Sequence, residues 1–246
     1  TGDGFIITVL FWLVLSLFGA LPFYFLGFSF VDSLFESMSG ITTTGATVFS
    51  GLDELDKSVL IYRQLLQWMG GMGLIVLAIA VMPLLGIGGG QLFKTQTPGA
   101  MSNQKLTPRI TNTARALWLI YLGLTILCLS SYKLAGMSFF DSFAHALSTV
   151  SIGGFSTHDA SIGFFNNINI EIVCMVFMIL SAINFSLHYG LIYRKQFLKY
   201  FYDPELRFFL SILFVITTVV CISLFTLTDI ANPLRYGIFQ SVSIVT

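Results

Sequence analysis

Two short polar strips interrupt an otherwise apolar sequence, and their residue types suit the coordination of a desolvated cation. Residues 41–47 read ITTTGAT and residues 150–157 read VSIGGFST. Neither strip contains a nucleophile–base pair, a cluster of metal-ligating side chains or a general acid. Each offers hydroxyl groups and a glycine, Gly45 or Gly154, that can adopt a positive φ. Such a backbone can turn consecutive carbonyl oxygens toward an axis and replace the water around a cation.

A short helical segment precedes each strip. Residues 31–41 and 140–150 lead into the two strips, and residues 234–245 form a similar segment at the end of the sequence. Crossing a hydrocarbon core of about 30 Å takes roughly 20 helical residues, so these segments are predicted to be re-entrant. We expect Asp32 and Asp141 to cap the first turns, and the helix C-termini to direct partial negative charge at the strips.

Long apolar stretches flank the short segments. Apolar residues make up 55% of the chain and charged residues 10%, compared with about 25% charged residues in a soluble domain. The sequence therefore predicts an all-α polytopic membrane protein surrounded by the lipid bilayer. Its 12 basic and 12 acidic residues balance, which argues against a nucleic-acid partner. Stretches long enough to span occur at residues 5–27, 59–85, 116–134, 168–193 and 208–227.

The sequence contains an internal repeat. Moving it by 109 positions places residues 32–33 on residues 141–142 and Gly45 on Gly154. Each copy runs in the same order: long apolar stretch, short segment, strip, long apolar stretch. The copies are therefore parallel repeats rather than inverted ones, an arrangement similar to that of potassium channels.

A third copy begins near the end of the sequence. A shift of 95 positions places residues 243–246 on residues 148–151, which makes Thr246 the first residue of a third strip. We expect the chain to be a piece of a longer protein. The predicted units are a first repeat at 1–86, a linker at 87–115, a second repeat at 116–197 and a partial third repeat at 198–246.

Charge placement predicts the orientation in the membrane. Basic residues gather after the second and fourth apolar stretches, at Lys94, Lys105, Arg109, Arg115, Arg194, Lys195, Lys199 and Arg207. Acidic residues gather on the other side, at Asp32, Glu36, Asp53, Glu54, Asp56, Asp141, Asp159, Glu171 and Asp229. By the positive-inside rule the linkers are cytoplasmic and the strips enter from outside. The acidic outer face would concentrate cations near the entrance.

Other residues in the apolar stretches have structural interpretations. Gly70, Gly71 and Gly73 are predicted to allow close helix packing, although they could also widen an ion cavity. Asn184 and His188 are four residues apart and could be functional or form interhelical hydrogen bonds. The three cysteines lie in apolar runs, which predicts small buried side chains rather than a disulfide or a zinc site.

Four stretches resemble one protein family, the TrkH/TrkG potassium-uptake proteins of the TrkH–KtrB–HKT superfamily. They are residues 39–46 (SGITTTGA), 67–73 (QWMGGMG) and 148–157 (STVSIGGFST), together with the linker motif KLTPR at 105–109. The resemblance extends over essentially all 246 residues.

The resemblance implies the transmembrane subunit of a potassium-uptake system, with four repeats around one axis and K+ as the transported ion. It implies no enzymatic activity and no cofactor. It also implies a multi-pass protein of the cell inner membrane, a homodimer, and a cytosolic nucleotide-binding TrkA-type regulatory subunit. Carried over by position, the potassium filter comprises Thr43, Thr44, Gly45, Ala46, Ile152, Gly153, Gly154, Phe155 and Thr246.

Two other classes of function are alternatives. A secondary carrier could couple the cation to protons or sodium, but no acidic residue lies mid-span to relay a proton. An intramembrane enzyme could use Asp3 in the sequence TGDG at residues 1–4, but no partner acid accompanies it. Proton-independent downhill flux would favour the pore over the carrier, and mutation of Asp3 would test the enzyme.

Overall fold

The computed structural model describes residues 2–85, 106–227 and 232–246, and within these ranges the regular structure is helical, without strands. The all-α fold predicted from the sequence is thus confirmed. The long helices are α1 (Gly2–Phe25), α3 (Lys57–Leu85), α5 (Leu106–Leu134), α7 (Ile168–Ala182) and α10 (Pro204–Leu227). The shorter elements are α2 (Phe30–Ile41), η1 (Leu52–Glu54), α6 (Phe139–Val150), η3 (Ser161–Phe165), α8 (Phe185–Arg194), α9 (Phe197–Phe201) and α11 (Pro233–Val245).

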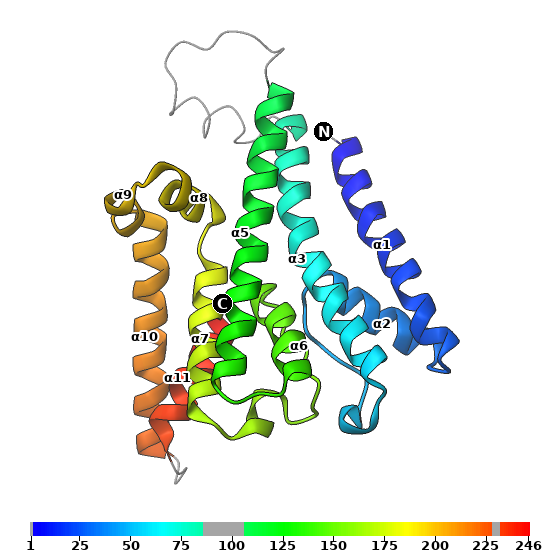
Figure 1. Ribbon diagram of the computed structural model, residues 1–246, viewed down its shortest axis with the longest axis vertical. Helices are drawn as coiled ribbons and strands as arrows, with labels where there is room; N and C mark the ends of the chain where they lie inside the picture. The colour runs from blue at the N-terminus through cyan, green and yellow to red at the C-terminus, as the bar shows by residue number, and fades with distance from the viewer. Residues whose placement is uncertain (1, 86–105, 228–231) are drawn as a thin grey trace.

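The helices form a row of similar units (Figure 1). In each unit a long helix is followed by a short helix packed against it: α1 by α2, α5 by α6, and α10 by α11. The first two units continue into α3 and α7. Contacts between α3 and α6 join the first unit to the second, and contacts between α7 and α11 join the second to the third. The short helices therefore lie at the same end of the molecule, as the parallel repeat predicts.

Serines, rather than the predicted aspartates, cap the short helices α2 and α6. Ser29 Oγ accepts a hydrogen bond from the amide of Asp32 at 3.1 Å and donates one to Asp32 Oδ2 at 2.7 Å. Ser138 and Asp141 form the same pair at 3.0 and 2.6 Å. The aspartates lie three residues into each helix, where their negative charge complements the helix N-terminus. The expectation that Asp32 and Asp141 are the caps was wrong by one turn.

The predicted span at 168–193 is broken. Helix α7 ends at Ala182, and α8 follows at an angle of 89°. Ile183 is extended, and the side chain of Asn184 caps α8 by accepting from the amide of Ser186 at 3.0 Å. His188 Nε2 lies 2.9 Å from the carbonyl oxygen of Leu180. The polar pair thus satisfies backbone groups at the helix break, which explains its presence in an apolar stretch.

Apolar side chains cover the outward faces of the row. Phe18 on α1 and Phe214 on α10 are exposed, as expected for contact with lipid. Within the described ranges, residues 114–134 and 204–227 have the length and hydropathy of a membrane span, and the bent pair α7–α8 has them when taken together.

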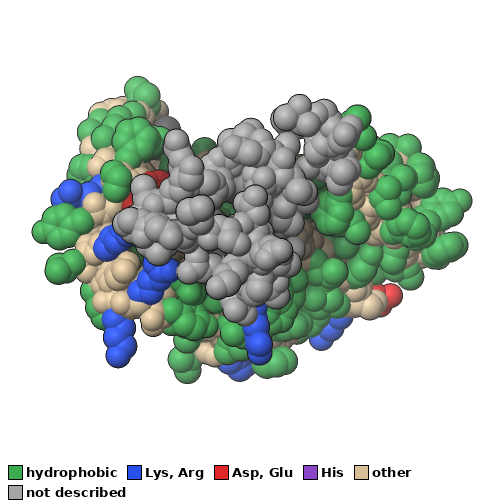
Figure 2. Space-filling view, turned by 90° about the horizontal axis from the view of Figure 1, so that it is seen from above, with side chains coloured by type: hydrophobic (Ala, Val, Ile, Leu, Met, Phe, Trp, Pro, Cys, Tyr) green, Lys and Arg blue, Asp and Glu red, His purple; other side chains and the backbone are tan. Residues whose placement is uncertain are grey.

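The two ends of the molecule, taken along the long helices, differ in the charge of their exposed side chains. Figure 2 shows the end that carries α8 and α9, where Lys and Arg side chains are prominent. Exposed basic residues at this end include Arg115, Lys195, Lys199 and Arg207. The opposite end exposes Asp53, Glu54, Asp56 and Asp159. Glu36 was also expected on that surface, but it is fully buried because it pairs with Arg63 inside the protein.

Glycines on α3 bring this helix against the short helices. A Cβ atom on Gly70 would overlap the carbonyl oxygen of Ile41, and one on Gly71 would approach Tyr121 Oη to 2.8 Å. The packing role predicted for Gly70 and Gly71 is therefore confirmed, whereas a Cβ on Gly73 would meet no atom within 4 Å. The free cysteines Cys128, Cys174 and Cys221 are buried, as expected for small apolar side chains.

Candidate functional site

The first strip (41–47) begins as the C-terminal cap of α2. The amide of Thr44 donates to the carbonyl oxygen of Ser39 at 2.9 Å, and the amide of Thr43 donates to that of Gly40 at 3.0 Å. Together these bonds form a Schellman cap, which reverses the chain direction as it leaves a helix. The cap turns the following residues out of the helix and into the strip.

The second strip (150–157) begins in the same way. The amide of Gly153 donates to Ser148 O at 2.8 Å, and the amide of Ile152 donates to Thr149 O at 3.1 Å. Each of these residues lies 109 positions after its counterpart in the first strip. The sequence repeat is therefore also a repeat of backbone hydrogen bonds.

Both strips contain two residues with positive φ. The predicted positions are confirmed, with φ of 77° at Gly45 and 84° at Gly154. The sequence did not predict the other two, Thr43 at 55° and Ile152 at 54°. Glycine normally occupies this position of a Schellman cap, and a β-branched side chain there is strained by about 1–3 kcal/mol. Backbone strain thus occurs at the same point in both repeats.

The two strips touch through their backbones. A Cβ atom on Gly45 would overlap the carbonyl oxygen of Gly153, and one on Gly153 would overlap the side-chain amide of Gln67. A Cβ on Gly154 would meet no atom within 4 Å. Glycine is therefore needed sterically at Gly45 and Gly153, whereas at Gly154 its positive φ is the reason.

A cavity of about 520 Å³ lies between the strips and α11. Its lining includes most of the predicted filter residues: Thr44, Gly45, Ile152, Gly153, Gly154, Phe155 and Thr246. Thr43 and Ala46 are not among the lining residues. Segments from three repeats, far apart in the sequence, thus meet at one space.

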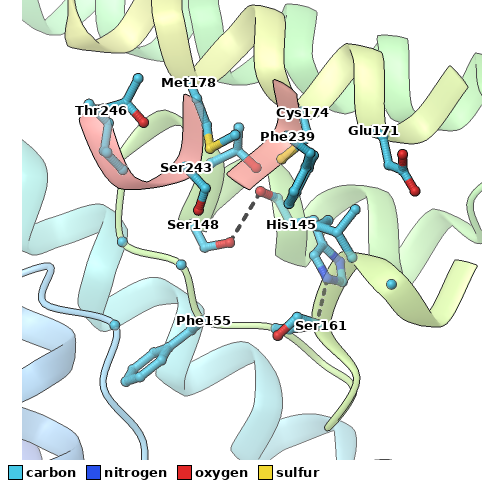
Figure 3. Close-up of a pocket in the computed structure, with 18 of the residues that line it drawn as sticks. His145, Ser148, Phe155, Ser161, Glu171, Cys174, Met178, Phe239, Ser243 and Thr246 are labelled. Atoms are coloured by element: carbon cyan, nitrogen blue, oxygen red, sulfur yellow. Dashed lines mark hydrogen bonds between the residues drawn. The ribbon is translucent and has the colours of Figure 1, made fainter. Parts of the chain in front are cut away.

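The cavity wall is rich in neutral oxygen atoms. Figure 3 shows Ser148, Ser243 and Thr246 around it, with Met178 and Phe239 supplying apolar surface. Its acidic residue, Glu171, is paired with Arg235 at 2.7 Å. In the part of the chain that the structure describes, no group of three His, Cys, Asp or Glu side chains could hold a metal ion. Hydroxyl side chains and the strip residues therefore make up much of the polar part of the wall.

Thr246, after α11, makes the same hydrogen bonds as Thr42 makes after α2. Its amide donates to Val242 O at 3.0 Å, and its hydroxyl donates to the same oxygen at 2.9 Å. Thr42 makes the same pair of bonds to Met38 O, at 2.9 and 2.7 Å. Helix α11 therefore ends in the same kind of turn as the one that begins the first strip after α2.

A buried ion pair supports the first strip. Arg63 Nε donates to Glu36 Oε1 at 2.6 Å, and neither side chain is exposed. The carboxylate also accepts from the amide of Val48 at 3.2 Å and from the Thr47 hydroxyl, whose oxygen lies 2.9 Å from Oε1. Arg63 Nη2 donates to Thr47 Oγ1 at 3.1 Å, and Nη1 donates to the carbonyl oxygen of Ser156 at 3.0 Å. Arg63 thus contacts both strips.

Besides Arg63 and the Asp141 carboxylate, which accepts from Thr157 Oγ1 at 2.8 Å, two neutral side chains support the second strip. His145 Nε2 lies 2.9 Å from Ser156 Oγ, and its Nδ1 lies 2.9 Å from the carbonyl oxygen of Asp141. Gln67 Oε1 accepts from the amide of Phe155 at 3.1 Å. The side chains of His145 and Gln67 are buried. They hold the strip from opposite sides, one from α6 and the other from α3.

Sequence reasoning missed these supporting residues. Arg63 lies in the second turn of α3. A usable signal was present, because Arg63, Gln64 and Gln67 put three polar side chains within one predicted span. The repeat register offered a second signal, since Glu36 and His145 are 109 positions apart.

A polar contact joins the loops that follow the first and second strips. Asp53 Oδ1 hydrogen-bonds His158 Nδ1, and Asp159 accepts from the amide of Leu52 at 3.2 Å through each carboxylate oxygen. The hydrogen bond to His158 holds the pKa of Asp53 below its ordinary value of 3.8, and the amide of Asp159 lowers that pKa further. His158 also stacks on Phe164. The loop after the second strip is thereby tied to the loop after the first.

Comparisons with known proteins give a consistent result. The family described as TrkH, cation transport protein, matches residues 1–243. The Trk system potassium uptake protein TrkH of Halomonas elongata is 50% identical over 100% of this chain and 52% of its own length. TrkG of Escherichia coli K12 is 51% identical over 86% and 44%. The crystal structure of the potassium transporter TrkH from Vibrio parahaemolyticus matches with a TM-score of 0.85 and 46% identity, over 99% of this chain and 50% of that one. The chain spans about half the length of these relatives.

Proposed function

Because the chain belongs to the TrkH family of cation transport proteins, we propose that it forms part of a selective pore for potassium uptake across the cell membrane. In this proposal it belongs to the transmembrane subunit of a Trk-type system. The observation that carries the proposal is the convergence of Thr44, Gly45, the second strip and Thr246 on one cavity. Four repeats around one axis would complete the ring of oxygens, and residues 1–86, 116–197 and 198–246 would supply two repeats and the start of a third.

Potassium would be held by backbone oxygens rather than by acidic side chains. The residues proposed as the filter are Thr43, Thr44, Gly45, Ala46, Ile152, Gly153, Gly154, Phe155 and Thr246. The C-termini of α2, α6 and α11 adjoin the strips, so their partial negative charge would favour a cation there. Carbonyl oxygens would replace the hydration shell, and the rigid caps at Thr43 and Ile152 would fix how far those oxygens can move.

The same proposal covers orientation and partners. The basic end with α8 and α9 would face the cytoplasm, and the strips would open to the outside of the inner membrane. The complete protein would form a homodimer and bind a cytosolic nucleotide-binding TrkA-type subunit. Support for a further subunit comes from the relatives' names, which describe a potassium uptake system.

The structure offers no support for a proton-coupled carrier. Glu36 is a buried acid, but it is fully engaged by Arg63, Thr47 and Val48. Both oxygens of this carboxylate are occupied by hydrogen bonds within the protein, so Glu36 is assigned a structural role rather than a proton relay. The relatives are transport proteins, and we propose no enzymatic role for the chain.

Reconstitution of the complete gene product tests the proposal. Proteoliposomes loaded with potassium should show downhill K+ flux that exceeds Na+ flux and does not change when the proton gradient is collapsed. Thr44→Ser keeps the backbone oxygen and should retain the preference for K+, whereas Gly45→Ser should reduce it. Flux that required a proton gradient would favour the carrier, and equal K+ and Na+ flux would reject the potassium filter.

A further inference from the structure

We propose that Glu36 and Arg63 are positioning residues that fix the first two strips relative to each other and thereby contribute to potassium selectivity. This inference rests on the proposed function of the strips as an ion filter. Neither side chain is among the residues that line the cavity, so the pair would act through the strip backbone. Its place is behind the strips, where α2, α3 and the second strip meet.

The contacts of Arg63 carry the inference. Each of its three donor nitrogens contacts a different segment: Nε contacts Glu36 on α2, Nη2 contacts Thr47 in the first strip, and Nη1 contacts the carbonyl of Ser156 in the second strip. Because the guanidinium is planar and rigid, it sets the spacing of all three segments together. The guanidinium also lies over the ring of Phe155, 4.4 Å from its centroid.

Glu36 completes the arrangement from the other side. Its Oε2 accepts from the amide of Val48, and both carboxylate oxygens lie within 3.0 Å of the Thr47 hydroxyl. The first strip is thus held at its outer end by a carboxylate and a guanidinium that also hold each other. A shift of either strip would have to break charge-assisted hydrogen bonds made by two side chains that are themselves fully buried.

Stability alone gives little reason for charges at this location. Burying two ions has a large desolvation cost, and well-packed apolar side chains in their place are often as stable or more so. What an apolar pair could not supply is directed hydrogen bonds to Ser156 O and Val48 N. The second repeat has neutral His145 at the position of Glu36, so within the described residues this ionic link belongs to the junction of the first two strips.

Two variants of the complete gene product separate positioning from folding. Arg63→Lys keeps a charge beside Glu36, but its single ammonium group cannot reproduce three directed contacts. The double variant Glu36→Met with Arg63→Met removes both charges, so it leaves no unpaired ion in the interior. The matched control is Arg207→Lys, which makes the same substitution at an exposed arginine whose guanidinium lies over Tyr202, at the end of the molecule that carries α8 and α9. Thermal unfolding of each purified variant reports on folding.

The readout is the ratio of K+ to Na+ permeability in proteoliposomes. We expect Arg63→Lys and the double variant to lower this ratio by about tenfold, the factor that corresponds to one lost charge-assisted hydrogen bond. Arg207→Lys should keep the wild-type ratio. Unchanged ratios in Arg63→Lys and the double variant, with a selective wild-type protein, would overturn the positioning role and leave the proposed pore intact. A non-selective wild-type protein would instead reject the proposed function itself.

Discussion

The first repeat supports its strip with a carboxylate, Glu36, in a buried ion pair with Arg63, whereas the corresponding position of the second repeat carries His145, which contacts a serine hydroxyl and a backbone carbonyl oxygen. Glu36 contacts the Thr47 hydroxyl, and 109 positions later His145 contacts the Ser156 hydroxyl. The backbone of the two strips is nonetheless the same, with Schellman caps and paired positive φ angles. One backbone geometry can thus be supported by two different side-chain chemistries.

The strips also differ in burial. Thr44 and Ala46 of the first strip are exposed, whereas Phe155 and Ser156 of the second are at most 5% exposed. The second repeat lies between α3 on one side and α11 on the other, while the first has a neighbouring repeat on one side within the described residues. The comparison shows that the strip conformation is set by local caps, and that its surroundings depend on its place in the row.

Replacing Glu36 in the first repeat or His145 in the second should give the largest difference between the repeats, measured as the free energy of unfolding. Glu36→Ala leaves the guanidinium of Arg63 buried without its carboxylate, and we expect a loss of about 3–5 kcal/mol in the free energy of unfolding. His145→Ala breaks neutral hydrogen bonds and should cost about 1–3 kcal/mol. Thermal or denaturant unfolding of the detergent-purified protein measures both. Equal losses would mean that the ion pair is no more important than the neutral bond.

Substitution of the strip glycines should give the next largest contrast. Both Gly45→Ala and Gly154→Ala place a side chain at positive φ, at a cost of about 1–2 kcal/mol. Only Gly45→Ala also creates an overlap, with the carbonyl oxygen of Gly153. We therefore expect Gly45→Ala to reduce the K+ to Na+ permeability ratio more strongly than Gly154→Ala. A stronger effect at Gly154 would show that this residue has a close neighbour in the complete protein.

Replacing the strained cap residues with glycine should stabilise the protein rather than destabilise it. Thr43→Gly relieves the left-handed strain and should stabilise the protein by roughly 1 kcal/mol. Ile152→Gly relieves the same strain but removes a larger, half-buried side chain, so its gain should be smaller. Melting temperatures test this order, with Thr43→Ala as the control that retains the strain. A gain in Thr43→Ala equal to that in Thr43→Gly would show that φ is not the cause.

The sequence predicted the parts of this arrangement that are local and repeated. The lengths of the short helices and the positive φ of Gly45 and Gly154 follow from apolar run length and residue type. The break at Ile183 could not be predicted in this way, because the apolar run continues through it and only Asn184 marks it. The contact of Arg63 with Ser156 joins residues 93 positions apart, and no local pattern encodes such a contact.

Acid pH should produce the smallest effect, at the outer contact between the two repeats. His158 lowers the pKa of Asp53 by hydrogen bonding to its carboxylate, so the folded protein binds this proton less readily than the unfolded chain does. The stabilisation from Asp53 is therefore fully present above its ordinary pKa of 3.8 and is lost as the pH falls through the lowered value. Because Asp53 is exposed, the gain is small.

We expect Asp53→Asn to melt slightly below the wild-type protein at pH 5, and the difference to shrink at pH 3. A difference for Asp53→Asn that grew toward pH 3 would contradict the sign of this linkage.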